Sequence, residues 1–258
     1  MPAPRSVLIT GASSGIGAAL AEAYAAPGTY LALGGRNRDR LEQTAEICRA
    51  AGAEVETEIL DVTHGDAMAA WITARHRHAA LDLVVANAGI SGVSGAAGGG
   101  AAPAPDGPVR QIFAVNVGGV VNTVVPAIPL LRARGRGQIA LMSSLAAFCP
   151  MPGAPAYGAA KSAVKNWGEA LRSRLGRDGI GVSVICPGFV ASRMTADNPF
   201  PMPMLMDAQK AAGIIRRGLD RNRARIAFPF PMYAAVRLIG ALPASVSGPL
   251  LSRSGDKE

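Results

Sequence analysis

Aromatic residues, lysine and paired cysteines are all scarce in this chain of 258 residues. Aromatic side chains make up 5% of it while 49% of the residues are hydrophobic, so the core must be built from Ala, Val, Leu and Ile. The cysteines Cys48, Cys149 and Cys186 are odd in number and far apart. Because they match neither a disulfide framework nor a zinc-ligand spacing, we expect free thiols in a reducing compartment.

Long apolar runs are also lacking. No uninterrupted run reaches the roughly 18–20 residues that a membrane-spanning helix needs. The nearest, residues 228–251, contains Arg237 and several prolines, and its helical part (232–242) is too short to span. The residues before the first strand-like run leave no room for a signal peptide. We therefore expect a soluble, cytoplasmic protein, and the hydrophobic content excludes a disordered chain.

Acidic residues are outnumbered, 18 against 26 basic residues, and the net charge is +8. A basic chain of this kind raises the question of nucleic-acid binding. However, the arginine clusters at 132–136 and 216–225 have no interleaved aromatics and no known DNA-reading pattern. We favour solvated helix ends and expect no nucleic-acid partner; an anionic partner such as phosphate, a membrane lipid or an acidic substrate is the alternative.

Short apolar, β-rich runs alternate with longer helical segments. Strands are predicted at residues 7–10, 30–34, 54–60, 81–86, 138–142, 181–186 and 225–228, and helices at 16–26, 38–51, 66–77, 109–133, 156–175 and 207–220. Strands that are apolar throughout and joined by helices form a parallel sheet covered on both faces. We predict an α/β fold with a Rossmann-type doubly wound parallel sheet of about seven strands. Residues 1–258 form one domain, of which 190–258 make the substrate lid and C-terminal tail.

The first turn is rich in glycine and leads directly from a strand into a helix. Glycines let a phosphate approach the backbone, and the helix N-terminus offers free N–H groups and the positive end of its dipole. A glycine-rich loop without a ligand is the alternative, but this position favours a dinucleotide site. The candidate binding residues are Gly11, Ser13, Ser14, Gly15, Ile16 and Gly17.

The end of the second predicted strand bears on the choice of cofactor. An NAD site places an Asp or Glu there to hold the ribose 2′-OH, but this chain has no carboxylate before Asp39. Arg36 can instead form charge-assisted hydrogen bonds with a 2′-phosphate and stack on adenine. A surface arginine capping the next helix is the alternative. We predict NADP(H) as the cofactor.

Further motifs occur in a fixed order along the chain. They are G-x-x-x-G-x-G at residues 11–17, Asn87-Ala88-Gly89, Asn116, Ser144, the Y-x-x-x-K pair Tyr157 and Lys161, and Pro187-Gly188. Over residues 5–228 the chain thereby resembles the short-chain dehydrogenase/reductase family in its compact branch. The resemblance implies cofactor contacts from Asp61, Val62, Asn87, Ala88, Gly89, Tyr157, Lys161, Pro187, Gly188, Val190 and Ser192.

The resemblance also implies catalytic roles for four residues. Tyr157 is the general acid and base, Ser144 holds the same substrate oxygen, and Lys161 binds the nicotinamide ribose. Asn116 matches the residue that fixes a water linking Lys161 to solvent. Tyr157 and Lys161 are four residues apart on one helix face, so we expect the lysine cation, together with the positive nicotinamide of an oxidised cofactor, to lower the pKa of the tyrosine. The three histidines offer no competing chemistry, and we expect no metal site.

The residues expected around the substrate are apolar. They are Leu145, Ala146, Phe148, Met151, Phe189, Met194 and the Met-rich run 200–206, with Arg193 as the nearest charge. Such a mouth favours a hydrophobic, long substrate, with ordinary core and lid packing as the alternative. A Gly-, Ala- and Pro-rich loop at 91–108 borders this site. The tail 228–251 could cover the pocket, pack in a dimer or touch a membrane surface, and the sequence does not rank these.

We therefore expect an NADPH-dependent oxidoreductase that reversibly reduces a ketone or long-chain 3-oxo group to a secondary alcohol. A non-catalytic NADP(H)-binding sensor or scaffold on the same fold is the alternative. A sugar-nucleotide epimerase or dehydratase would need a larger C-terminal domain. The family pairs subunits through the helix 109–133 and the Tyr157 helix, where Ala160, Ala163, Val164 and Trp167 suggest an apolar outer stripe. We predict a homodimer or a 222 tetramer.

Overall fold

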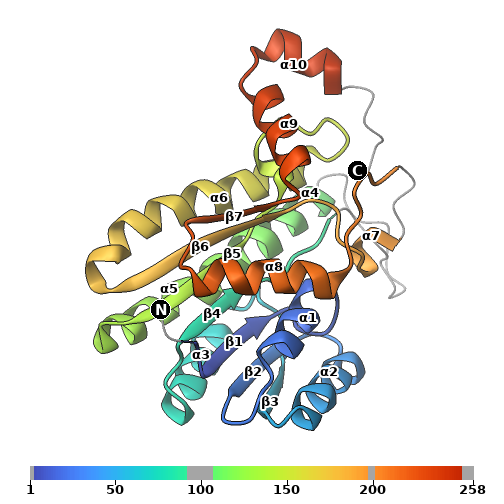
Figure 1. The fold of residues 1–258 in the computed structure, drawn as a ribbon. Coiled ribbons are helices and arrows are strands. Elements are labelled where there is room, and N and C mark those ends of the chain that lie inside the picture. The colour runs from blue at the N-terminus through green and yellow to red at the C-terminus, as the bar shows by residue number, and fades with distance from the viewer. Residues whose placement is uncertain (1–2, 92–106, 197–200, 252–258) are drawn as a thin grey trace.

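A computed structural model of the chain describes residues 3–91, 107–196 and 201–251. Most of the predicted loop 91–108 and Phe200 lie outside these residues. The described strands form one sheet in the order β3-β2-β1-β4-β5-β6-β7, and every neighbouring pair is parallel (Figure 1). The strands are β1 Ser6–Thr10, β2 Tyr30–Gly35, β3 Glu54–Ile59, β4 Leu83–Ala86, β5 Gly137–Met142, β6 Ile180–Pro187 and β7 Arg225–Phe228. The predicted doubly wound, single-domain fold is confirmed.

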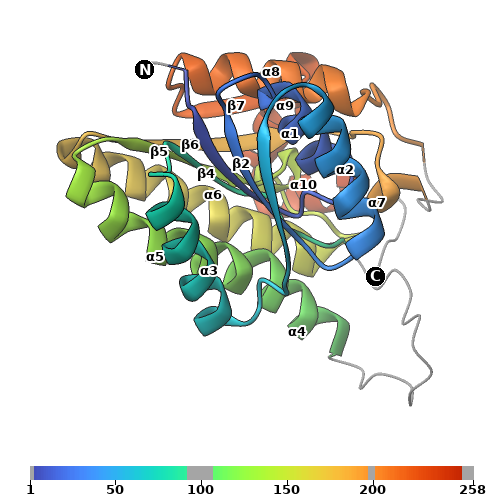
Figure 2. The ribbon, with the colours of Figure 1, turned by 90° about the horizontal axis from the view of Figure 1, so that it is seen from below.

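Helices cover the sheet on both faces, as Figure 2 shows in a view that separates the layers. One layer holds α1 Gly15–Tyr24, α2 Arg38–Ala50 and α8 Ala208–Asp220. The other holds α3 Gly65–His78, α5 Gly119–Arg134 and α6 Pro155–Leu175. The central strands β1 and β4 are buried along their whole length. The polar residues at their carboxyl ends are therefore fixed in place, at the point where the strand order reverses.

The chain that runs from α4 into α5 is one long helix with an irregular centre. It starts as α4 Gly107–Phe113, continues as a π-helical segment at Ala114–Gly118 and ends as α5. By length and composition alone Gly107–Arg134 could cross a membrane, although Asn116, Asn122 and Thr123 interrupt its apolar residues. The helix packs on α3, α6 and the sheet, as the core helix of a globular fold does.

Helix α6 turns its apolar residues inward. Ala160 is fully buried and Val164 is 2% exposed, while Ala159 and Ala163 face solvent. The predicted outer stripe of Ala160, Ala163, Val164 and Trp167 is therefore wrong in two of its four members. Val164 packs on the sheet and Ala160 packs on Ile112 of α4, so both belong to the inner side of the helix.

The C-terminal part contains more helix than the sequence pattern indicates. Short turns η2 Leu145–Ala147, η3 Gly176–Asp178 and α7 Arg193–Ala196 precede it, and β7 is followed by α9 Phe230–Gly240 and α10 Ala244–Leu251. Helix α9 packs on β7 and η2 while Phe230 and Leu238 remain more than 70% exposed. The sequence left three roles open for the tail: covering the pocket, packing in a dimer or touching a membrane surface. The contact of α9 with η2, which follows β5, favours the first.

Candidate active site

The carboxyl edge of the sheet begins with the glycine loop between β1 and α1. Gly11 and Gly15 have φ of +68° and +56°, which glycine adopts without strain. A Cβ on Gly17 would lie 2.2 Å from the carbonyl oxygen of Gly11. Ser14 precedes α1, and its side chain makes no capping hydrogen bond to the helix. This tight, side-chain-poor backbone at a helix N-terminus fits a dinucleotide phosphate.

Thr10 and Asn87 join the ends of β1 and β4 beneath this loop. The backbone N–H of Asn87 donates to Oγ1 of Thr10 over 3.0 Å, and Nδ2 of Asn87 donates to the carbonyl oxygens of Thr10 and Gly11. Ala88 N–H also donates to Thr10 Oγ1. Thr10 is a positioning residue that the sequence motifs did not single out. Its place directly before Gly11 is the signal that could have identified it.

The ends of β2 and β3 form the side of the groove expected to hold adenosine. Arg36 is 62% exposed, and its nearest guanidinium nitrogen lies 3.9 Å from a carboxylate oxygen of Asp61. Partial burial opposes ionisation of Asp61, but hydrogen bonds from Thr63 and the charge of Arg36 outweigh it, so its pKa is lowered. Val62 is buried against Gly119. Arg36 is thus accessible to an anion.

Ser144 and Tyr157 meet between β5 and α6. Oγ of Ser144 accepts from the backbone N–H of Ala146 over 3.1 Å, and so caps η2. A hydrogen bond also links the side chains of Ser144 and Tyr157. Ser144 can therefore cap η2 and still take part in catalysis with Tyr157. Two hydroxyls placed together can act on one substrate oxygen.

Lys161, Asn116 and Gly89 meet behind the two hydroxyls. Nζ of Lys161 donates to the carbonyl oxygen of Met142 over 3.0 Å and lies 5.6 Å from the ring centre of Tyr157. Asn116 is fully buried in the π-helical segment, and both ends of its side chain bond the backbone of Ile90 at 2.8 Å. A Cβ on Gly89 would lie 2.9 Å from Asn116 Oδ1 and 3.3 Å from Lys161 Nζ.

The pKa shifts at this centre differ from the expectation. Burial raises the pKa of the Tyr157 phenol, and the hydrogen bond with Ser144 only partly opposes the rise. Burial also lowers the pKa of Lys161 to about 8. In the protein without a cofactor, burial and not the charge of Lys161 sets the direction of the shift, and the predicted lowering by Lys161 together with an oxidised nicotinamide stays a prediction. Tyr157 therefore keeps its proton at neutral pH.

The segment after β6 lies on the opposite side of the glycine loop. Gly188 N–H donates to the carbonyl oxygen of Phe228 over 2.7 Å, which ties the segment to β7. Val190 is buried and pairs with Met206 in an isolated bridge. A Cβ on Gly15 would lie 3.0 Å from Cβ of Ser192. The segment Pro187–Ser192, which follows from the carboxyl end of β6, therefore contacts the glycine loop.

The expected substrate mouth is only partly open. Leu145 is 3% exposed and packs with Met232 and Tyr233 of α9, so it belongs to the core. Phe148 lies edge-on to Tyr233, and the cations of Lys165, Arg225 and Arg237 lie within 6.0 Å of its ring centre. The expectation that Arg193 is the nearest charge is therefore wrong at Phe148. Ala146, Met151, Phe189 and Met194 are partly exposed.

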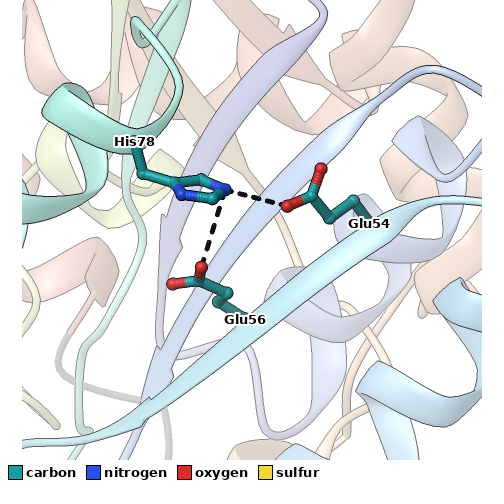
Figure 3. Close-up of side chains that lie close together, drawn as sticks. All are labelled: Glu54, Glu56 and His78. Atoms are coloured by element: carbon teal, nitrogen blue, oxygen red, sulfur yellow. Dashed lines mark hydrogen bonds and ion pairs between the residues drawn. The ribbon is translucent and has the colours of Figure 1, made fainter.

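Two features at the amino edge of the sheet lie away from this site. Glu54 and Glu56 of β3 and His78 of α3 point toward one another (Figure 3), with 2.8 Å between His78 Nε2 and Glu54 Oε1. Arg75 also pairs with Glu56, so ion pairing between α3 and β3 explains this cluster. A nearby hollow of about 450 Å³ is lined partly by Arg134 and Asp82, which pair with each other.

Comparisons with known proteins agree with this arrangement. The profile of the family described as "short chain dehydrogenase" matches residues 5–200. An uncharacterized oxidoreductase of Myxococcus xanthus is 39% identical over 240 residues, covering 93% of each chain. A short-chain dehydrogenase/reductase from Burkholderia phymatum in complex with NAD superposes with a TM-score of 0.79 at 26% identity, covering 91% of this chain and 92% of that one. A short-chain dehydrogenase from Sphingobium yanoikuyae in complex with NADPH has a TM-score of 0.77 at 26% identity, covering 98% and 97%.

Proposed function

The chain belongs to the short-chain dehydrogenase family, and we propose that it is an NADPH-dependent reductase that converts a ketone or 3-oxo group to a secondary alcohol. The family makes it an oxidoreductase that uses a nicotinamide dinucleotide. The observation that carries the proposed reaction is the meeting of Ser144, Tyr157 and Lys161 beside the glycine loop at one edge of the sheet. A hydride donor bound along that loop, when present, supplies the electron pair for the reduction.

The side chains of this centre divide the remaining work. Tyr157, whose raised pKa keeps it protonated, donates its phenol proton to the substrate oxygen as the alkoxide forms. Ser144 donates a hydrogen bond to the same oxygen. Lys161 is held by the carbonyl of Met142 and serves the nicotinamide ribose. In the reverse reaction Tyr157 accepts the proton, so alcohol oxidation is favoured at higher pH.

The preference for NADPH rests on the end of β2. Arg36 is exposed there and no carboxylate occupies the position that would hold a ribose 2′-OH. We expect NADPH to bind more tightly than NADH, and Arg36→Ala to remove most of that preference, because the 2′-phosphate loses its charge-assisted bonds. Cofactor fluorescence titrations measure both affinities. Equal affinities in the native protein would overturn the choice of NADPH.

A hydrophobic substrate is supported by the apolar residues beside the two hydroxyls. Met151 lies against Gly158, the residue after Tyr157, and Met151, Phe189 and Met194 are partly exposed; methionine adapts to irregular apolar groups. A panel of ketones and 3-oxo compounds of increasing chain length, followed by NADPH absorbance, tests this. Turnover of any of them excludes a purely non-catalytic sensor. The buried free thiols support a cytoplasmic location.

A further inference from the structure

The short turn η2 is capped by Ser144 at its start and by Phe148 at its end. The hydroxyl of Ser144 accepts a hydrogen bond from the N–H of Ala146 over 3.1 Å, and the N–H of Phe148 donates to the carbonyl oxygen of Leu145 over 3.2 Å. These bonds make the segment from the Ser144 hydroxyl to the Phe148 ring a single folded turn. The position of Ser144 therefore depends on what holds Phe148.

Helix α9 contacts the backbone at the end of this turn. A Cβ on Gly240, the last residue of α9, would lie 1.8 Å from the carbonyl oxygen of Phe148 and 3.4 Å from Cα of Cys149. Only a residue without a side chain can approach a backbone this closely. Near the start of α9, Sδ of Met232 lies 2.9 Å from where a Cβ of Gly188 would be. The helix is thus packed on the segment after β5 and on the segment after β6.

The ring of Phe148 is surrounded by side chains from α6, β7 and α9. Nζ of Lys165 lies 5.4 Å from the ring centre, and the guanidinium carbons of Arg225 and Arg237 lie 5.2 and 6.0 Å from it. Tyr233 of α9 meets the ring edge-on, with 5.2 Å between the ring centres. Because cations at such distances are attracted to an aromatic ring, Phe148 is held from several elements at once.

The partners of the ring are themselves fixed by hydrogen bonds and ion pairs. Nε of Arg225 donates to a carboxylate oxygen of Glu169 over 2.9 Å, and another nitrogen of Arg225 donates to the hydroxyl of Tyr233 over 2.9 Å. Lys165 lies 3.9 Å from the second carboxylate oxygen of Glu169. The carboxylate offsets the repulsion between the two cations, so the cluster gives Phe148 a rigid seat.

We propose that Phe148 is a positioning residue for the reaction, whose ring, seated between α9 and the cations, holds η2 so that Ser144 stays beside Tyr157. This role rests on the proposed function and deepens it, because Phe148 lies outside the motifs that carry that function. The sequence indicates that Phe148 lines the substrate mouth. In the structure its surroundings favour an action through Ser144 instead.

Single-turnover hydride transfer from NADPH to an accepted ketone tests this role. Phe148→Ala should slow the transfer by about 10- to 100-fold, the usual effect of a small misplacement of a reacting group, while the Kd for NADPH stays near native. Phe148→Tyr should retain most of the rate because it keeps the ring, and Phe148→Leu, which keeps apolar volume without the ring, should fall between. Phe230→Ala is the matched control, since Phe230 is on α9 but 73% exposed, and it should react at the native rate.

The dependence on Ser144 distinguishes positioning from a general loss of stability. If the ring acts through Ser144, Phe148→Ala should slow the reaction much less in the Ser144→Ala background than in native protein. Gly240→Ala, which forces a methyl group against the carbonyl of Phe148, should give the same pattern. Equal factors in the two backgrounds would overturn the proposal. So would a loss confined to the KM of large ketones, because it would show that Phe148 contacts the substrate.

Amide hydrogen exchange of the protein without ligand gives a readout that needs no activity. The N–H groups of Ala146, Ala147 and Phe148 are all bonded within the turn, so their exchange reports how firmly η2 is held. The peptide covering residues 144–148 should exchange faster in Phe148→Ala and at the native rate in Phe230→Ala.

Failure of the positioning role and failure of the proposed function give different results. Native exchange in Phe148→Ala, in a protein that does reduce ketones, would show that the positioning role alone is wrong. Faster exchange in Phe148→Ala, in a protein that turns over no ketone of the panel, would show that the proposed function is wrong although the ring holds η2.

Discussion

Tyr157 shows how one residue receives its role from its surroundings. A phenol in water has a pKa near 10, and burial in this site raises it further while Ser144 stabilises the ionised form by a hydrogen bond. A buried, protonated phenol beside a second hydroxyl is suited to giving a proton to a developing alkoxide. Burial also lowers the pKa of Lys161, which disfavours its charged form. The protonated phenol of Tyr157 is therefore the form present before substrate binds.

Replacing Tyr157 by Phe separates acid catalysis from packing. Tyr157→Phe keeps the ring and removes only the hydroxyl, so NADPH affinity should change little. Single-turnover hydride transfer to any accepted ketone should slow by about 10²–10⁴-fold, the usual contribution of a positioned acid. Ser144→Ala should also keep cofactor binding and lose rate. A Tyr157→Phe variant that transfers hydride at the native rate would show that another group is the acid.

The lowered pKa of Lys161 predicts how stability depends on pH. Its pKa falls from 10.5 to about 8 because the side chain is buried. Between these values the unfolded chain binds more protons than the folded chain, so the contribution of Lys161 to the free energy of unfolding rises with pH. Below pH 8 both states are charged and the burial penalty is complete. Urea titrations without nucleotide measure the free energy of unfolding of native protein and of Lys161→Met. The value for native protein minus the value for Lys161→Met should rise from about pH 7 to 9.5. A difference that does not change with pH would contradict the assigned shift.

At the scale of elements, the sequence predicts what is local and repetitive. Apolar runs such as residues 7–10 and 181–186 were recognisable as buried strands, and the order of strands and helices implied the sheet. The π-helical segment around Asn116 was not predictable, since no residue pattern marks it; in the structure Asn116 bonds the backbone of Ile90 from this segment. Helix α10 was not predicted either, because Pro243 and Pro249 interrupt the apolar run in which it lies.

Some site features depend on tertiary contacts that no motif encodes. The rise in the pKa of Tyr157 comes from burial, which depends on how α6 packs, and the sequence alone indicated the opposite direction. The fixed-spacing pair Tyr157 and Lys161 was visible because one helix carries both.

The glycine loop and helix α8 offer a matched test of what a single methyl group does. A Cβ on Gly17 in α1 would overlap the carbonyl of Gly11 and lie 2.5 Å from Asn87 Nδ2. Gly17→Ala should therefore lose about 1–3 kcal/mol of stability and weaken NADPH binding. In α8 a Cβ on Gly213 would meet only the end of Arg217 at 3.4 Å. Gly213→Ala should gain about 0.5–1 kcal/mol, because alanine favours the helix. Urea unfolding measures both, and equal effects at the two sites would contradict the crowding of the loop.

At the scale of the molecule, the two edges of the sheet do different work. The amino edge is closed by ion pairs, such as Arg134 with Asp82 and Arg75 with Glu56. The carboxyl edge carries the glycine loop, the hydroxyls of Ser144 and Tyr157 and the exposed Arg36 and Arg193, and α9 packs on η2. Ion pairs therefore bind the charged residues at the amino edge to one another, while Arg36 at the carboxyl edge stays accessible to a ligand.

The long helix from α4 to α5 leaves an apolar row on the outside of the molecule. Val109, Phe113, Val121 and Val125 are 36–49% exposed and fall on positions spaced by four or eight residues. Beside them α6 exposes the small residues Ala159 and Ala163. Apolar surface of this kind is stabilised by burial, and a two-fold axis would bury it against itself. We therefore propose a homodimer, or a 222 tetramer containing this pair, joined through α5 and α6.

Light scattering on the purified protein at micromolar concentration should give the mass of a dimer or tetramer. Val125→Asp places a charge in the row and should lower that mass, while NADPH affinity per chain stays near native because the row lies outside the cofactor groove. Ile47→Asp is the control, since Ile47 is 53% exposed on α2, on the opposite face of the sheet. A native monomer, or equal masses for native protein and Val125→Asp, would show that this row does not join subunits.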